Sequence, residues 1–202
     1  KRPKIGIRSN FLTADLDDEV QIAFARACER LSYGADLIET SLPSLEIAAD
    51  IGILGGFSQI EGARDHAELF ARVGRACDPR VMDRFDAGSR IDRQDYLRMI
   101  ELRTQMINRF REETAHLDVI AYPSVAMIPP RLGDLAEDTD YYQANARAYR
   151  NAGIANLLDG CAISVPCMAR DSAPVGLTLM GVHGSDACLL ATADLLESAI
   201  RG

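Results

Sequence analysis

The feature that most constrains the fold is a strand–helix–strand pattern within the first 40 residues. A strand is predicted at Lys4–Arg8, and Asp15–Glu19 then places acidic side chains where a helix dipole favours them. Apolar residues recur at helical spacing as far as about Tyr33, Gly34 ends the helix, and Ala35–Thr40 reads as a second strand. Two strands joined by a helix in this way are expected to be parallel.

The middle of the chain is predicted to be helical. Between Ser44 and Arg90 the helical pattern is interrupted at Gly52, at Gly55–Gly56 and at Pro79. Asp92 is expected to cap a long helix that follows. The apolar stripe of this helix consists of Tyr96, Met99, Ile100, Met106, Ile107, Phe110 and Leu117.

The remainder alternates strands with helices, which predicts an α/β fold of about five strands. Residues 123–140 are rich in proline and acidic residues and are expected to form a long loop, a kind of segment that is often functional. The further strands are predicted at Asp118–Tyr122, Cys161–Val165 and Pro174–Gly181, and the further helices at Tyr141–Leu158 and from Ser185 or Asp186 to the end.

Composition excludes several classes of protein. The chain has 202 residues, of which 48% are hydrophobic and 26% charged, as in ordinary globular domains. Its net charge of -8 argues against direct nucleic-acid binding, and no apolar run approaches the roughly 20 residues that cross a bilayer. The five cysteines show no metal-binding spacing, so we expect reduced, mostly buried thiols in a cytoplasmic protein. The two lysines are Lys1 and Lys4, so a buried lysine base would have to lie at this N-terminal end or in another chain.

No local motif identifies an active site. The sequence contains no G-x-S-x-G, Walker A or H-E-x-x-H pattern, and no metal site is expected. His66 and His116 are expected on the surface, each within or near the end of a predicted helix. His183, between a strand and a helix, is better placed for a site, but an exposed turn histidine is the favoured interpretation.

Several segments, in order, resemble enzymes of the amidase signature family. Asp118–Ser124 resembles the family's D-V-L-L-x-P-T, and Tyr149–Pro166 resembles its R-N-x-x-x-x-N-x-x-G-x-P-A-x-S-x-P segment. Pro174–Gly181 is similar to P-V-G-L-Q-L-x-G, and Asp186 with Leu189–Leu190 matches D-x-x-L-L. The upstream residues Lys4–Ile7 and Leu16–Val20 resemble L-R-I-G-V and L-D-P-E-V, so the similarity runs along the whole chain.

The resemblance implies a mixed sheet flanked by helices on both faces, here about five strands of a larger sheet. In the family, a Gly/Ser-rich stretch supplies a nucleophilic serine, a bridging serine and oxyanion donors, and an upstream lysine serves as base. All of these precede the segment that resembles Lys4–Ile7. We therefore expect residues 1–202 to be a single region, the C-terminal half of an amidase signature domain, with no catalytic residue and no activity on its own.

The resemblance also points to a substrate pocket. The family uses the segment matching Asn151–Ala162, with the loop after the Asp118 strand, to wall the acyl pocket. Here Ala152, Gly153, Ala155 and Asn156 would face or flank that pocket. An alternative is that these small residues only permit close packing of a helix on the sheet.

The leading expectation for function is hydrolysis of a carboxylic amide to an acid and ammonia or an amine, through an acyl-serine and without metal or organic cofactor. Its partners would be a small-molecule amide and the N-terminal half of the same enzyme, with a homodimer left open. One alternative is a non-catalytic scaffold that pairs with another chain. Another is the glutaminase subunit of a tRNA-dependent amidotransferase, although Asn156–Ala162 departs from the N-L-A-G-x-P-A usual there.

Overall fold

The chain divides into two compact units. A computed structural model describes residues 2–7 and 10–202. The first unit contains the residues up to Pro43 together with Ile107–Gly202, and the second contains Ser44–Met106. The strands are β1 (Lys4–Ile7), β2 (Asp36–Glu39), β3 (Val119–Pro123), β4 (Cys161–Pro166) and β5 (Gly176–Gly181). The helices are α1 (Asp18–Leu31), α2 (Ile47–Ile53), α3 (Phe57–Asp65), α4 (Ala67–Val73), α5 (Pro79–Ser89), α6 (Arg93–Thr114), α7 (Asp138–Ala152), α8 (Ile154–Leu157) and α9 (Asp186–Arg201).

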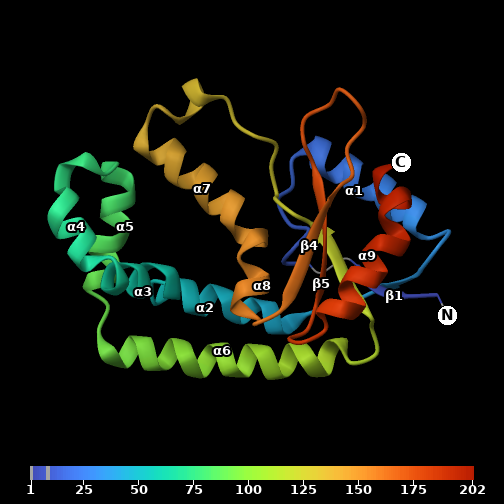
Figure 1. Ribbon diagram of the computed structural model, residues 1–202, viewed down its shortest axis with the longest axis horizontal. Helices are drawn as coiled ribbons and strands as arrows, with labels where there is room; N and C mark the ends of the chain where they lie inside the picture. Colours follow the sequence, from blue (N-terminus) through green and yellow to red (C-terminus); the bar gives the residue numbers. More distant parts are fainter. Residues whose placement is uncertain (1, 8–9) are drawn as a thin grey trace. The chain divides into compact units, whose positions relative to one another are not determined.

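The first unit is built on a mixed five-stranded sheet with the order β2-β1-β3-β5-β4 (Figure 1). Strand β1 pairs in parallel with β2 and with β3, so the parallel pairing expected from the first strand–helix–strand pattern is confirmed. Strand β5 pairs antiparallel with β3 and with β4. The last residue of the first predicted strand, Arg8, lies outside the described residues.

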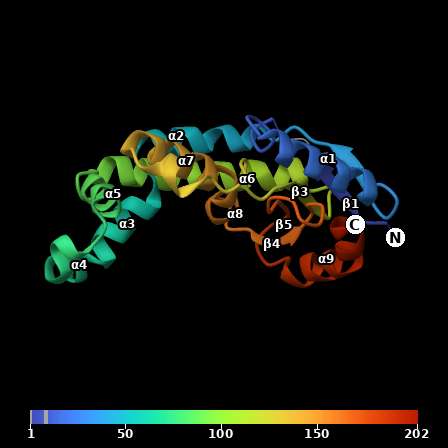
Figure 2. The same ribbon diagram turned by 90° about the horizontal axis from the view of Figure 1, so that it is seen from above.

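Helices α1 and α9 cover one face of this sheet and form its main core (Figure 2). The strands alternate, so Leu177 and Leu179 of β5 join this core while Thr178 and Met180 face the other way. On that other face, Phe110 near the end of α6 and Met180 line one pocket of about 340 Å³. Helical residues thus lie on both faces of the sheet, as expected.

The second unit is helical, and α3 and α5 approach each other closely within it. A Cβ atom built on Gly88 of α5 would lie 2.1 Å from the carbonyl oxygen of Gln59 in α3. The rings of Phe70 and Phe85 lie 4.6 Å apart between centroids, and Tyr96 donates a hydrogen bond to Glu61 at 3.0 Å. As expected, Gly55–Gly56 separate α2 from α3, and Pro79 is the first residue of α5. The break expected at Gly52 is wrong, because Gly52 lies inside α2.

Two other local predictions are confirmed and one is wrong. Asp92 caps α6, because its Oδ1 accepts a hydrogen bond from the Asp95 amide at 2.8 Å. His66 and His116 are exposed, as expected. All five cysteines lie in the described part of the chain as free thiols, but only Cys167 is buried, so the expectation that most of them would be buried is wrong. The spacing of the cysteines in the sequence does not indicate which of them are buried.

Within the described residues, no helix combines the length and the apolar composition that crossing a bilayer requires.

Candidate substrate pocket

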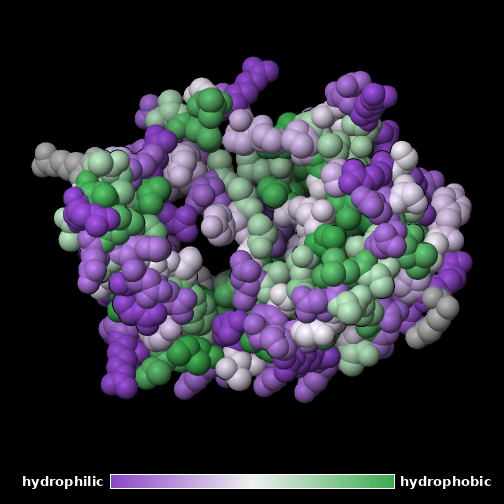
Figure 3. Space-filling model, in the orientation of Figure 1, coloured by the Kyte–Doolittle hydropathy of each residue, from purple (hydrophilic) through white to green (hydrophobic). Residues whose placement is uncertain are grey.

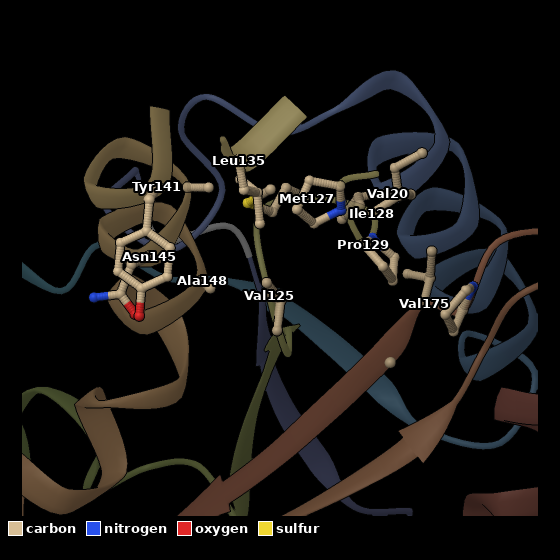
Figure 4. A pocket seen from close by; sticks show the side chains of 14 residues that line it. Val20, Val125, Met127, Ile128, Pro129, Leu135, Tyr141, Asn145, Ala148 and Val175 are labelled. Atoms are coloured by element: carbon tan, nitrogen blue, oxygen red, sulfur yellow. The ribbon is translucent and has the colours of Figure 1, made fainter. Parts of the chain in front are cut away.

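The first unit contains an apolar pocket of about 320 Å³ between the loop that follows β3 and helix α7 (Figure 4). Its walls come from α1, from the loop, from α7 and from the start of β5. The lining residues are Val20, Val125, Met127, Ile128, Pro129, Pro130, Leu135, Tyr141, Ala144, Asn145, Ala148, Pro174, Val175 and Gly176.

The loop wall belongs to the segment predicted to be a functional loop, residues 123–140. Strand β3 ends at Pro123, and Pro129 and Pro130 provide no amide hydrogen with which to continue a sheet. Beyond the end of the strand, the loop turns its apolar side chains, Met127 among them, into the pocket.

The opposite wall is one face of α7. Tyr141, Asn145 and Ala148 follow each other at i, i+4 and i+7, so they lie on the same side of the helix (Figure 4). Ala144 and Ala148 have short side chains, which leave the space open. Tyr141 and Asn145 are the two residues with polar side-chain groups among the described residues that line this mainly apolar pocket.

A cluster of three hydroxyl groups lies where β3, β4 and β5 meet next to the pocket. Ser124 Oγ is 2.6 Å from Ser164 Oγ and 2.7 Å from Thr178 Oγ1. Gly176 lines the pocket and also makes room for this cluster, because a Cβ atom there would lie 2.7 Å from the hydroxyls of Ser124 and Ser164. Each of the three residues lies in a different segment that resembles the amidase signature family, and the sequence did not show that their hydroxyl groups would meet.

Helix α7 is anchored by buried hydrogen bonds beneath the pocket. The side-chain amide of Asn151, which is fully buried, donates to the carbonyl oxygens of Leu12 at 2.9 Å and Pro123 at 2.8 Å. The neighbouring Arg150 donates to the carbonyl of Ala14 and, at 3.1 Å, to Asn151 Oδ1. The helix is thereby tied to the segment before α1 and to the end of β3.

Asp17 and Arg147 form an ion pair beside the pocket. Arg147 Nη2 lies 2.8 Å from Asp17 Oδ1, and both side chains are largely shielded from solvent. Burial by itself would raise the pKa of Asp17, but hydrogen bonds from Arg147 and from the Ile128 amide, with the attraction of the Arg147 charge, lower the pKa below its usual value. Asp17 is therefore ionised at neutral pH.

The four residues predicted to face or flank the substrate lie just beyond this pocket and do not line it. Ala152 ends α7 and is exposed, and Gly153 is half-buried between α7 and α8. Ala155 is buried and Asn156 is exposed, both in α8. Their role as substrate residues stays a prediction. The loop after β3, which the resemblance implies as the other wall of the substrate site, does line the pocket.

The sequence reasoning missed the α7 wall. The i, i+4, i+7 spacing of Tyr141, Asn145 and Ala148 in the sequence places them on one helix face, but it does not indicate that this face lines a pocket. His183 is exposed, as the favoured interpretation held, and its Nδ1 lies 3.1 Å from Asp159 Oδ2. Across residues 2–7 and 10–202, no three His, Cys, Asp or Glu side chains are grouped so that they could hold a metal ion.

The surface of the first unit carries scattered apolar side chains. In Figure 3, hydrophobic residues are interspersed with hydrophilic ones over the region of β4 and α9. Leu190 and Leu195 of α9 are exposed there. Single exposed leucines are common on protein surfaces and indicate no site by themselves.

The fold agrees with a sequence match. The profile of the Amidase family matches residues 1–190. The chain belongs to the Amidase family. The amidase signature resemblance inferred from the motifs is confirmed.

The relatives and solved structures align with nearly all of this chain, but this chain aligns with only part of each of them. A 2-amino-5-chloromuconic acid deaminase from Comamonas testosteroni is 32% identical, with 98% of this chain aligned to 43% of that protein. A glutamyl-tRNA(Gln) amidotransferase subunit from Methanosphaera stadtmanae is 25% identical, with 96% of this chain aligned to 44% of that protein. A crystal structure of an amidase superposes with a TM-score of 0.80 at 24% identity, covering 99% of this chain and 46% of that one. The chain thus spans less than half the length of these relatives.

Proposed function

We propose that this chain forms the C-terminal part of an amidase that hydrolyses a carboxylic amide through an acyl-serine. The observation that carries the proposal is the family match over residues 1–190, aligned with under half of each relative. The nucleophilic serine, the lysine base and the oxyanion donors would then lie outside residues 1–202. This proposal is supported by the resemblance to the amidase signature family, in which those groups precede the segment that matches Lys4–Ile7.

In the proposed reaction, the serine oxygen attacks the amide carbonyl and the nitrogen leaves as ammonia or an amine after taking up a proton. Water then attacks the acyl-serine and releases the acid. Each donor to the oxyanion contributes about 10²–10³-fold to such a reaction. Neither step requires a metal or an organic cofactor, and the chain described above would contribute the substrate surface.

Two parts of the first unit support a role in holding the substrate. The pocket between the loop and α7 offers an apolar surface for the hydrocarbon part of an amide. Ala152, Gly153, Ala155 and Asn156 follow α7 directly, and we propose that they wall a neighbouring part of the same substrate site. The exposure of Ala152 and Asn156 is compatible with that role.

The test is ammonia release by the intact protein from a panel of small carboxylic amides. The panel includes acetamide and benzamide, and 2-amino-5-chloromuconic acid is added because the relative at 32% identity is named for its deamination. The proposal expects ammonia from at least one carboxylic amide. Release from none of the amides, by a folded intact protein, would overturn it.

A second candidate is the glutaminase subunit of a tRNA-dependent amidotransferase, which the match to the amidotransferase subunit of Methanosphaera stadtmanae favours. Its distinguishing result is ammonia release from glutamine that rises when glutamyl-tRNA(Gln) and the partner subunits are added. A scaffold without catalytic activity would release ammonia under none of these conditions. Simple amides hydrolysed by the protein alone favour the first candidate.

A further inference from the structure

Asp17 stands immediately before α1, where an acidic side chain commonly caps a helix, but its carboxylate makes no capping hydrogen bond. It turns instead to the loop that follows β3. Asp17 Oδ2 accepts a hydrogen bond from the Ile128 amide at 3.0 Å. The Asp17 amide donates to the carbonyl oxygen of Ala126 at 2.9 Å. One residue therefore holds the loop at two points.

The other carboxylate oxygen of Asp17 binds α7. Oδ1 accepts from Arg147 Nη2 at 2.8 Å, and the same nitrogen donates to the Asp15 carbonyl at 3.0 Å. The side chains of Arg147 and Asp17 are 32% and 27% exposed. At this degree of burial the pair is screened less by solvent and salt than a pair on the open surface.

The elements that Asp17 joins are the walls of the apolar pocket. Val20 lies in the first turn of α1, Ile128 is in the loop wall, and Arg147 is in α7 next to Ala148. The separation of the loop from α7 sets the width of the pocket. The bonds from Asp17 to Ile128 and Arg147 bridge that separation directly.

We propose that Asp17 is a positioning residue that fixes the width of the apolar pocket and so sets the size of the hydrocarbon group that the enzyme accepts. The proposal rests on the proposed amidase function. A cavity of about 150 Å³ lined by apolar side chains holds benzene. The pocket of about 320 Å³ is therefore large enough for an aryl or branched alkyl group. A preformed wall lowers the cost of ordering the loop when such a group binds.

The test compares Asp17→Asn with Asp18→Asn in the intact protein. Asp18 is the exposed neighbour at the start of α1, so its replacement removes the same charge without touching the loop or α7. An asparagine at position 17 keeps one acceptor oxygen, and its amide group cannot accept from either the Ile128 amide or Arg147. Because the charged guanidinium of Arg147 attracts that oxygen more strongly than a neutral backbone amide does, the substitution breaks the hydrogen bond from the Ile128 amide.

The first measurement is hydrogen exchange, which does not depend on activity. We expect the Ile128 amide to exchange at least about tenfold faster in Asp17→Asn, with Asp18→Asn unchanged. Amides in the middle of β3, such as that of Ala121, should keep their protection in both variants, because the sheet pairs them. Unchanged exchange at Ile128 would overturn the proposal.

The second measurement is the kinetics of acetamide and benzamide hydrolysis. We expect Asp17→Asn to raise KM for benzamide about tenfold or more while kcat for acetamide stays within about twofold, since the defect lies in holding the bulky group. An equal fall in kcat for both amides would contradict a positioning role. If the wild-type protein hydrolyses none of the amides in the panel, the proposed amidase function fails, whereas faster Ile128 exchange would still establish that Asp17 holds the loop.

Discussion

At the scale of single residues, Asn151 is the side chain on which the site most depends. It is completely buried, and its amide nitrogen serves the carbonyl oxygens of Leu12 and Pro123, which lie far apart in the sequence. The family motif marked this asparagine, but its partners depend on how the chain folds. The sequence therefore indicated that Asn151 matters, but not which backbone groups it binds.

Asn151→Ala should lower the free energy of unfolding by about 2–4 kcal/mol, because two buried carbonyl oxygens lose their donor. The measurement is urea unfolding followed by circular dichroism. Asn108→Ala, at an exposed position of α6, is the matched control and should change stability by less than about 0.5 kcal/mol. Equal effects of the two substitutions would contradict the anchoring role.

The cysteines give a second prediction at this scale. Burial raises the pKa of Cys167 to about 11, an effect that the charge of Arg30 only partly offsets. Native protein treated with iodoacetamide at pH 8 should therefore be alkylated at the exposed Cys188 and not at Cys167. Peptide mass spectrometry reads the positions, and prior unfolding in urea should make both react. Prompt native labelling of Cys167 would refute the assignment.

The raised pKa of Cys167 also makes the stability of the protein depend on pH. The unfolded chain loses the Cys167 proton near pH 9, whereas the folded chain holds it to about pH 11. Between these values the folded state binds more protons, so this residue makes stability fall as pH rises, and its contribution is complete below about pH 9. The stability of Cys167→Ala should consequently depend less steeply on pH across that range.

At the scale of elements, local sequence patterns predicted the positions of most helices and strands. The remaining boundaries depend on contacts between elements. Asp92 caps α6 as predicted, because a cap depends on residues three positions apart. Helix α7 instead begins at Asp138, inside the segment expected to be a loop, and ends at Ala152 with α8 following. Acidic residues at 138 and 140 suit a helix start, but prolines nearby at 129 and 130 favoured the loop interpretation.

Two glycines in helices test how closely elements pack. Gly88→Ala should destabilise the protein, because the new Cβ would lie 2.1 Å from the Gln59 carbonyl oxygen and would force α3 and α5 apart. Gly52→Ala in α2 meets no atom within 4 Å and should instead stabilise the helix by about 0.5–1 kcal/mol. Thermal unfolding of both variants gives the comparison. A stabilising Gly88→Ala would show that the helices are not in this close contact.

At the scale of the whole molecule, the alternation of strands and helices was enough to predict an α/β sheet of about five strands, and the motif order was enough to identify the family. The pocket could not be predicted in the same way. Its walls come from α1, the loop after β3, α7 and the start of β5, which only the sheet brings together. Ala152, Gly153, Ala155 and Asn156 were chosen by their place in a motif, and they lie next to that pocket.

We propose that residues 1–202 belong to a serine-dependent amidase whose nucleophile lies outside them. The most direct test of this proposal is labelling with a fluorophosphonate that reacts with activated serines, followed by mass spectrometry of the labelled peptide. We expect the intact protein to be labelled at a serine outside residues 1–202, and the isolated 202-residue chain to remain unlabelled. Covalent labelling of a serine within residues 1–202 would contradict the account.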